Sequence, residues 1–207
     1  MSWQSETVAV VSPMSTTDIE HVARAVLQHL APVRWREPGT INYEELVDRR
    51  LAGEGVHFYP ETMGSKHLGF NEAVTRIRCE ALDMPIEVFM EEDQYDALFE
   101  GGPLAYRPRA TCLHELGHVA MHVFPLRRRL LRMRANPELD LNRACRGQIP
   151  AYHDPEWQAW TFAGFLAAPR HHVVELADLS VDELAVVFGV SSQFMASHLR
   201  RMRIERK

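Results

Sequence analysis

The stretch His114-Glu115-Leu116-Gly117-His118 carries most of a metal site and its catalytic base within five residues. On an α-helix, residues four apart lie on one face, so both imidazoles can reach a single ion. Glu115 emerges beside them, where its carboxylate can hydrogen-bond a water molecule held in the ion's open position. Imidazole suits Zn²⁺, which lowers the pKa of bound water toward ~7. The pentapeptide predicts a zinc hydrolase with ligands His114 and His118 and the general base Glu115; the alternative is an ordinary helix with this spacing by chance.

The residues around the motif predict a buried helix. Pro108 and Thr111 are compatible with a helix that starts near them, and the sequence stays apolar up to Pro125, which we expect to end the helix. His122 lies two turns beyond His114, ~12 Å along the axis, and cannot share the ion. It either supports a ligand or is a satisfied core histidine, and we favour the core histidine.

A hydrolytic zinc site needs a third protein ligand, and residues 154–169 offer a candidate. Asp154 can cap a helix, Pro155 fits its first position, and the apolar run that follows predicts a buried helix. Small residues in that run allow another helix to approach closely. Glu156 is the only carboxylate inside the helix. It is either a zinc ligand or a surface residue that complements the helix dipole, and the spacing alone leaves both roles open.

Taken together, these motifs resemble the ImmA/IrrE family of zinc metallopeptidases. The match spans residues 84 to 200, in the family's order and spacing. The segments that carry it are residues 91–98, residues 109–118 with His122, the pattern Glu156-x-Gln158-Ala159 with Phe162, Ala163 and Pro169, and residues 184–191. Two positions depart from the family pattern: Trp160, where it usually has Asn or Asp, and Cys112, where it usually has an aliphatic residue.

The resemblance implies one Zn²⁺ per chain, held by His114, His118 and Glu156, with Glu115 as the base. It also implies a regulatory zinc metalloendopeptidase that cuts a helix-turn-helix repressor and relieves transcriptional repression under stress or on phage or mobile-element signals. Glu115 would take a proton from the attacking water and pass it to the leaving amine. The alternative function is a nucleic-acid-sensing or DNA-binding regulatory module with a structural zinc. A fourth protein ligand in every state would favour that module.

The periodicity of the rest of the chain predicts an α+β fold. Apolar residues recur with helical spacing over residues 19–30 up to Pro32, and Asn42 opens a second helix that runs to about residue 51. Alternating apolar residues predict strands at 56–59, 75–81 and 86–90. We expect a zincin-like single domain, mostly helical, with a small antiparallel sheet beside the HExxH helix, whose edge binds peptide by strand addition. Residues 1–70 form an N-terminal helical segment packed on the core, and residues 71–207 form the peptidase domain with a C-terminal helical pair.

Composition is typical of a small intracellular enzyme. The chain has 207 residues, of which 46% are hydrophobic, and this is enough for one core without disulfides. The net charge of −5 does not indicate a general nucleic-acid-binding protein. The three cysteines form no CxxC pair, which argues against a zinc ribbon or a disulfide framework and for reduced thiols. No signal peptide and no apolar run near ~18 residues is visible, so we expect a cytoplasmic protein without membrane contact.

Two further segments have competing interpretations. Residues 182–199 resemble a helix-turn-helix that would bind DNA, or form a helical pair that completes the peptidase core, which we favour. The second segment is an arginine run in an acidic chain. It is either a solvated helix face or a docking surface for an anionic ligand, with single-stranded nucleic acid as a candidate activator and an acidic face of the repressor as the competing ligand. Its members are Arg127, Arg128, Arg129, Arg132 and Arg134.

One cysteine is a candidate for regulating the zinc site. A thiolate in the fourth position of zinc would exclude water and silence the enzyme. Cys112 lies two residues before His114, hence ~200° away around the helix, and is badly aimed. Cys79, on the predicted strand 75–81, is free to face the site; the alternative is a small core residue.

Overall fold

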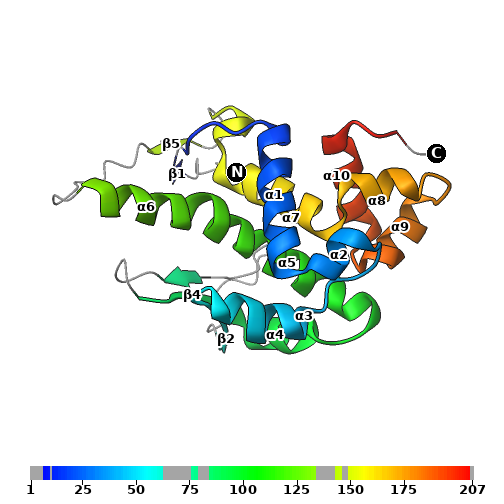
Figure 1. The fold of residues 1–207 in the computed structure, drawn as a ribbon, viewed down its shortest axis with the longest axis horizontal. Coiled ribbons are helices and arrows are strands. Elements are labelled where there is room, and N and C mark those ends of the chain that lie inside the picture. Colours follow the sequence, from blue (N-terminus) through cyan, green and yellow to red (C-terminus); the bar gives the residue numbers. More distant parts are fainter. Residues whose placement is uncertain are drawn as a thin grey trace, which may run out of the picture.

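The computed structural model describes residues 7–9, 11–62, 76–78, 84–133, 143–145 and 149–205, and most of them are helical (Figure 1). The α-helices are α1 (Thr16–Leu30), α2 (Pro32–Arg36), α3 (Tyr43–Glu45), α4 (Glu92–Leu98), α5 (Tyr106–His118), α6 (Phe124–Met133), α7 (Pro155–Ala167), α8 (Arg170–Glu175), α9 (Val181–Phe188) and α10 (Ser192–Met202). Two segments, η1 (Leu46–Leu51) and η3 (Val119–Val123), are π-helical, and two short 3₁₀ turns cover Gly102–Ala105 and Ala151–His153. The predicted α+β class is confirmed at this coarse level.

The strands form one small mixed sheet and one separate pair. β2 (Val56–Glu61), β4 (Ile86–Glu91) and β3 (Arg76–Arg78) lie in the order β2-β4-β3, while β1 (Thr7–Ala9) pairs antiparallel with β5 (Arg143–Cys145). β3 runs antiparallel to β4, but β2 runs parallel to it. The prediction of an antiparallel sheet is therefore wrong for the β2–β4 pair. Side-chain alternation reveals which residues face the core but not the strand direction, and the long connection between the two strands permits parallel pairing.

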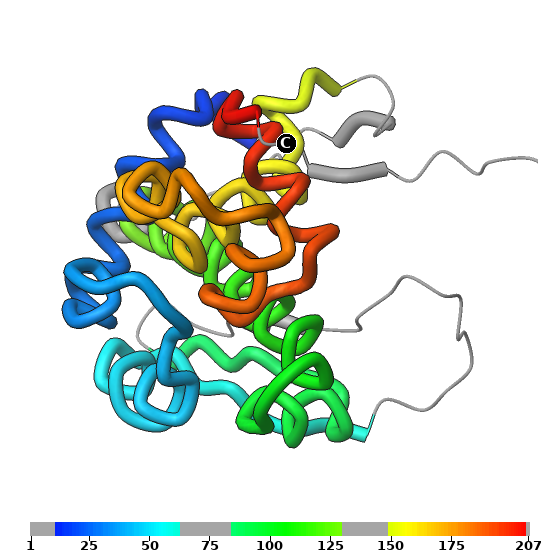
Figure 2. The backbone as a smooth tube through the Cα atoms, turned by 90° about the vertical axis from the view of Figure 1, so that its right-hand side faces the viewer, coloured from blue at the N-terminus to red at the C-terminus, as the bar shows by residue number. Residues whose placement is uncertain are grey.

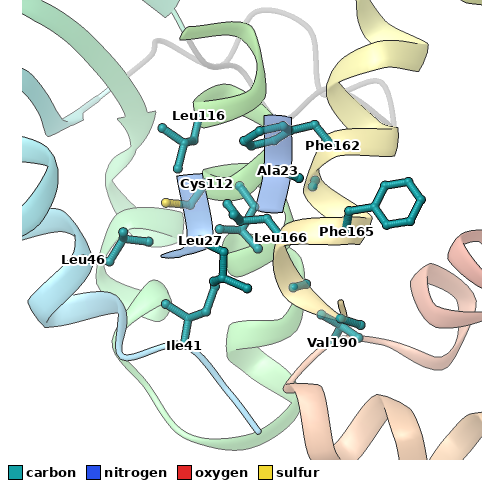
Figure 3. Packing of buried hydrophobic residues seen from close by; sticks show 14 of the residues in the cluster. Ala23, Leu27, Ile41, Leu46, Cys112, Leu116, Phe162, Phe165, Leu166 and Val190 are labelled. Atoms are coloured by element: carbon teal, nitrogen blue, oxygen red, sulfur yellow. The ribbon is translucent and has the colours of Figure 1, made fainter. Parts of the chain in front are cut away.

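Helix α1 shows how the apolar periodicity predicts the core. Ser15 caps it in a reciprocal pair with Asp18, and Ile19, Ala23 and Leu27 are buried along one face. This face packs on α7, which crosses α1 near its middle (Figure 1). Figure 3 shows labelled side chains of α1, α5 and α7 close together in the hydrophobic core cluster. The core includes buried residues from both the predicted N-terminal segment 1–70 and the predicted domain 71–207, so a single core runs across that boundary.

Helices α5 and α7 approach each other very closely at Gly117. A Cβ atom at this position would lie 3.1 Å from the Cα and carbonyl oxygen of Ala159 and 3.1 Å from Cδ1 of Phe162. The glycine thus removes the side chain that would hold the two helices apart. Asp154 caps α7 by accepting a hydrogen bond from the Glu156 N–H, with Pro155 at the first position as predicted. The closeness of the two helices fixes how near Glu156 comes to the motif histidines on α5.

The helix that carries the motif does not end at Pro125. α5 starts at Tyr106, passes through the π-helical segment η3, and continues as α6 beyond the proline. The Phe124 N–H bonds to the Val119 carbonyl, a π-type spacing. The wider turn shifts the hydrogen-bond pattern just before a residue that has no N–H to donate, and this allows the helix to continue. The predicted helix end at Pro125 is therefore wrong, and the predicted start near residues 108 to 111 is a few residues late.

The C-terminal helices form the pair that the sequence predicts, and they face the viewer in Figure 2. Ser180 and Glu183 form a capping box for α9, Gly189 ends it at φ 65°, and Ser191 caps α10. Leu184, Ala185, Phe188, Met195, Leu199 and Met202 are buried in the core cluster. This packing is what a pair that completes the core requires, while a DNA-binding role for it stays a prediction.

His198 attaches α10 to α7. The ring is fully buried, Nε2 donates to the Ala168 carbonyl at 2.9 Å, and the ring lies against the Cα of Gly164. Burial, assisted by the nearby charges of Arg201 and Arg170, lowers the pKa of His198 from 6.5 to about 4.

In the described part of the chain, no helix has the length and apolarity needed to cross a membrane.

We expect Gly117→Ala to destabilise the fold by about 1–3 kcal/mol, because the added methyl group must push α5 and α7 apart. Urea denaturation followed by circular dichroism measures the change. Gly53→Ala is the matched control, since a Cβ there meets nothing within 4 Å. Equal free energies of unfolding for the Gly117→Ala variant and wild type would show that α5 and α7 can accommodate a methyl group at this position.

We expect His198 to make the fold acid-sensitive. Between pH 6.5 and about 4 the unfolded histidine binds a proton that the folded one does not, so the free energy of unfolding falls as the pH falls through this window. The full effect of such a shift is about 3 kcal/mol. His198→Gln, which keeps a donor for Ala168, should flatten the pH dependence measured by urea denaturation. An unchanged slope would contradict the burial of a neutral ring.

Candidate metal centre

The structure brings His114, His118 and Glu156 together between α5 and α7. The two histidines lie one turn apart at the end of α5, and Glu156 lies in the first turn of α7. The two Nε2 atoms are 3.1 Å apart. His114 Nε2 lies 3.2 Å from Glu156 Oε2, and His118 Nε2 lies 3.2 Å from Glu156 Oε1. These residues form a group that could hold one metal ion.

The size of this group fits a tetrahedral ion. With metal–nitrogen bonds of about 2.05 Å, two ligand atoms of a tetrahedral site are separated by about 3.3 Å. The separation of the two Nε2 atoms is 3.1 Å, and each Nε2 lies 3.2 Å from a different oxygen of Glu156, so each of these pairs is spaced like two ligands of one tetrahedral ion. Within the described ranges, no fourth His, Cys, Asp or Glu joins the group. The nature of the ion does not follow from this geometry alone.

The three side chains of the candidate metal centre differ in their exposure to solvent. The His114 side chain is 7% exposed and the His118 side chain 16%, while Glu156 is 34% exposed. Solvent can therefore approach the group from the Glu156 side. The imidazoles of His114 and His118, by hydrogen bonding, lower the pKa of Glu156 far below its usual range, although burial opposes the shift. A carboxylate that stays ionised is suited to bind a cation.

Glu115 lies beside the three ligand atoms without joining them. Its Oε1 is 3.9 Å from His114 Nε2, and its side chain is 9% exposed. This position agrees with the geometric role that the sequence assigns to it. A carboxylate one position away in phase sits next to the ion site, where it can contact a molecule bound there.

A chain of buried polar groups lies behind His118. Its Nδ1 contacts His122 Nδ1 at 3.1 Å, and His122 Nε2 contacts Gln158 Oε1 at 2.9 Å. Gln158 is fully buried, and its Nε2 donates to the carbonyls of Ser12 and Tyr152 at 2.9 and 2.8 Å. Both amide protons are thus in use, which fixes the side-chain oxygen toward His122.

This chain sets the tautomer of His118. Because the Gln158 oxygen can only accept, His122 must donate from Nε2, and its Nδ1 is then an acceptor in the neutral ring. Burial lowers the pKa of His122 to about 4, so the neutral ring is the relevant form. With a cation bound, His118 would therefore donate from Nδ1 and present the lone pair of Nε2 to the ion, whereas without a cation Nε2 can donate to Glu156 and lower the pKa of that carboxyl. A lone pair that faces an ionised carboxylate is favourable around a cation and unfavourable without one.

His122 fits both interpretations that the sequence offers. It is hydrogen-bonded to Gln158, as a satisfied core histidine would be, and it also contacts His118 of the candidate metal group directly. The signal was present: His118 and His122 repeat the four-residue spacing of His114 and His118. Gln158 was noted only as part of the family pattern, and its contact across two helices has no signature in local spacing.

Trp160 covers the other ligand. Its ring lies over that of His114, with centroids 4.2 Å apart and planes tilted by 34°. His114 Nδ1 is buried and has no hydrogen-bond partner in the described part of the structure. The indole thus fixes His114 by stacking, whereas His118 is fixed by hydrogen bonds.

The cysteine predictions have different outcomes. Cys79 lies outside the described residues, so its predicted access to the metal stays a prediction. Cys112 is fully buried on α5, and burial, with the charge of Glu115 as a smaller cause, raises the pKa of its thiol far above its usual range. It is therefore a protonated core thiol, as its angle around the helix predicts.

The arginine run is placed only in part. Arg127 donates to the Met84 carbonyl at 2.6 Å, while Arg128 and Arg129 are exposed on α6, which extends away from the body of the molecule (Figure 1). The side chain of Arg132 and the whole of Arg134 lie outside the described residues. Docking of an anionic ligand on this run stays a prediction.

Comparison with known proteins identifies no relative of this chain. No protein-family model, no curated protein and no solved structure gives a significant match to this chain. The resemblance to the ImmA/IrrE family therefore rests on the quoted motifs, and the site is interpreted from its own geometry.

We expect Gln158→Met to weaken zinc binding by about 10- to 100-fold, because His122 and then His118 lose the hydrogen bonds that fix the ligand's tautomer. Competition with a fluorescent zinc chelator measures the affinity. Gln28→Met, an exposed change on α1, is the matched control. A folded Gln158→Met variant that binds zinc like wild type would rule out this support.

Proposed function

We propose that this protein is a zinc-dependent endopeptidase with a zincin-like active site. The observation that carries the proposal is the group of His114, His118 and Glu156, whose Nε2–Nε2 and Nε2–carboxylate distances suit one tetrahedral ion, with the Glu115 carboxylate next to it. Two imidazoles and one carboxylate are the usual ligands of catalytic zinc in peptidases. Partial exposure of Glu156 supports an open side where a substrate can enter.

Zinc, when bound, supplies a Lewis acid that polarises the substrate carbonyl and makes water more acidic. The residues of the chain perform the proton transfers. Glu115 accepts a proton from the attacking water while the water oxygen forms a bond to the carbonyl carbon. Glu115 then delivers that proton to the leaving nitrogen as the C–N bond breaks. Burial of Glu115 keeps bulk water from competing for the proton. His118, fixed by His122 and Gln158, keeps its lone pair directed at the metal.

The proposed substrate is a helix-turn-helix repressor, as the resemblance to the ImmA/IrrE family implies. A single regulatory cut in such a repressor would relieve transcriptional repression under stress or on phage or mobile-element signals. Because the ligand group lies in a folded core with one open side, an extended segment of the substrate is the form that fits it.

The alternative is a nucleic-acid-binding module in which zinc is structural. A structural zinc is closed by four protein ligands. Among the described residues only three gather, and six apolar residues of the C-terminal helical pair are buried in the core. Both observations favour the enzyme.

We expect Glu115→Gln to keep one bound metal per chain and to lower cleavage of the helix-turn-helix protein encoded beside this gene by about 10²- to 10⁴-fold, because an amide cannot accept the proton. Cleavage is followed by gel electrophoresis and mass spectrometry of the fragments. Glu44→Gln, an exposed change on α3, is the matched control. A chelator should stop cleavage by wild type, and added zinc should restore it.

Two results would contradict the proposal. Cleavage by the Glu115→Gln variant at the wild-type rate would exclude Glu115 as the base. Tight, chelator-sensitive nucleic-acid binding without cleavage of any candidate repressor would favour the structural-zinc module.

A further inference from the structure

We propose that a pocket beside His114 binds an acidic side chain of the peptide substrate, next to the bond that is cut. The inference rests on the proposed function and names the substrate class for the same site. The pocket has a volume of about 480 Å³ and lies between α5, α7 and α10.

Two helix faces and one aromatic ring form the pocket. On α5, Arg107 and Thr111 lie seven and three residues before His114, hence on the same face as this ligand. On α10, Phe194, Ser197 and Arg201 share one face for the same reason. Trp160 of α7 lines the pocket at the end next to His114.

The pocket is close enough to the metal centre to receive a side chain of a bound peptide. Trp160 contacts the His114 ring at a centroid distance of 4.2 Å and the Phe194 ring at 6.4 Å, so one residue borders both the ligand group and the pocket. Along the axis of α5, Thr111 lies ~4.5 Å before His114, and Arg107 lies ~10 Å before His114. An extended peptide advances ~3.3 Å per residue, so the pocket matches a residue directly beside the cleaved bond or the one after it.

The charge of the pocket favours a carboxylate. Arg107 and Arg201 both line it, and none of the described lining residues is acidic. Neither guanidinium forms an ion pair or hydrogen bond with a residue in the described part of the chain. Arg201 is half-buried, and burial, followed by repulsion from Arg200, lowers its pKa. A partly desolvated, unpaired guanidinium binds a carboxylate more strongly than one at an open surface does.

The other lining residues fit the rest of an acidic side chain. The rings of Trp160 and Phe194 offer apolar walls for its methylene groups, and Ser197, whose hydroxyl accepts a hydrogen bond from Arg200, adds a polar group to the lining. A lysine side chain would share the apolar walls but meet two like charges. The pocket therefore selects by charge more than by size.

Peptidyl hydroxamates that chelate zinc and carry Glu, Gln or Lys in the adjacent position provide the test. The chelating group places each compound at the metal, so differences in affinity report the pocket without requiring catalysis. Binding to the zinc-loaded Glu115→Gln protein is measured by calorimetry. We expect the affinity of the Glu compound to be at least about tenfold higher than that of the Gln compound, and the Lys compound to bind most weakly.

Charge reversal provides the decisive variant. Arg201→Glu should invert the order, so that the Lys compound binds best, and Arg201→Gln should remove the preference for Glu. Arg203→Glu is the matched control, because it makes the same change in charge on a nearby exposed residue that does not line the pocket. Equal inversion by both variants would show a long-range charge effect and overturn the pocket.

The outcomes separate this inference from the proposed function. If all three hydroxamates bind with equal affinity, the metal centre stands and the acid-binding pocket is wrong. If none of them binds the zinc-loaded protein, the accessible catalytic zinc is wrong, and the inference that rests on it falls too.

Discussion

The contact between Gly117 and Ala159 is the constraint on which the site depends. Because no side chain separates α5 from α7 at this point, the first turn of α7 reaches the end of α5, and Glu156 comes within 3.2 Å of both histidines. The same closeness lets Gln158 cross from α7 to His122 and Trp160 cross to His114. Ligands, their supports and the pocket wall are therefore all consequences of one interhelical distance.

Much of the site could be predicted from the sequence because its information is local. The spacing of His114 and His118 on one helix, and the capped start of α7, each reside in a few consecutive residues. Glu156 needed more, since its two local roles were equally consistent with the sequence until the family pattern was added. The structure places it with the histidines, as that pattern implies.

The parts that could not be predicted depend on contacts between distant segments. The parallel pairing of β2 with β4 follows from the path of the intervening chain, which alternation does not encode. The continuation of the helix through Pro125 follows from a π-helical turn, which no composition rule marks. The fixing of His118 by Gln158 joins positions that only the packed helices bring together. Local patterns thus predicted which helices carry the histidines and Glu156 of the candidate site, but not the contacts that hold these side chains in place.

The π-helical segment η3 determines which way the side chains of α6 face relative to those of α5. A π turn accommodates one residue more than an α turn, so winding the same residues of η3 as an ordinary α-helix would change the angular position of every residue beyond it. Everything beyond η3 would then rotate by ~100° about the helix axis. Arg127 would turn away from Met84, and the exposed arginines of α6 would face a different side of the molecule. The extra residue therefore sets the direction in which the side chains of α6 point, independently of His114 and His118 on α5.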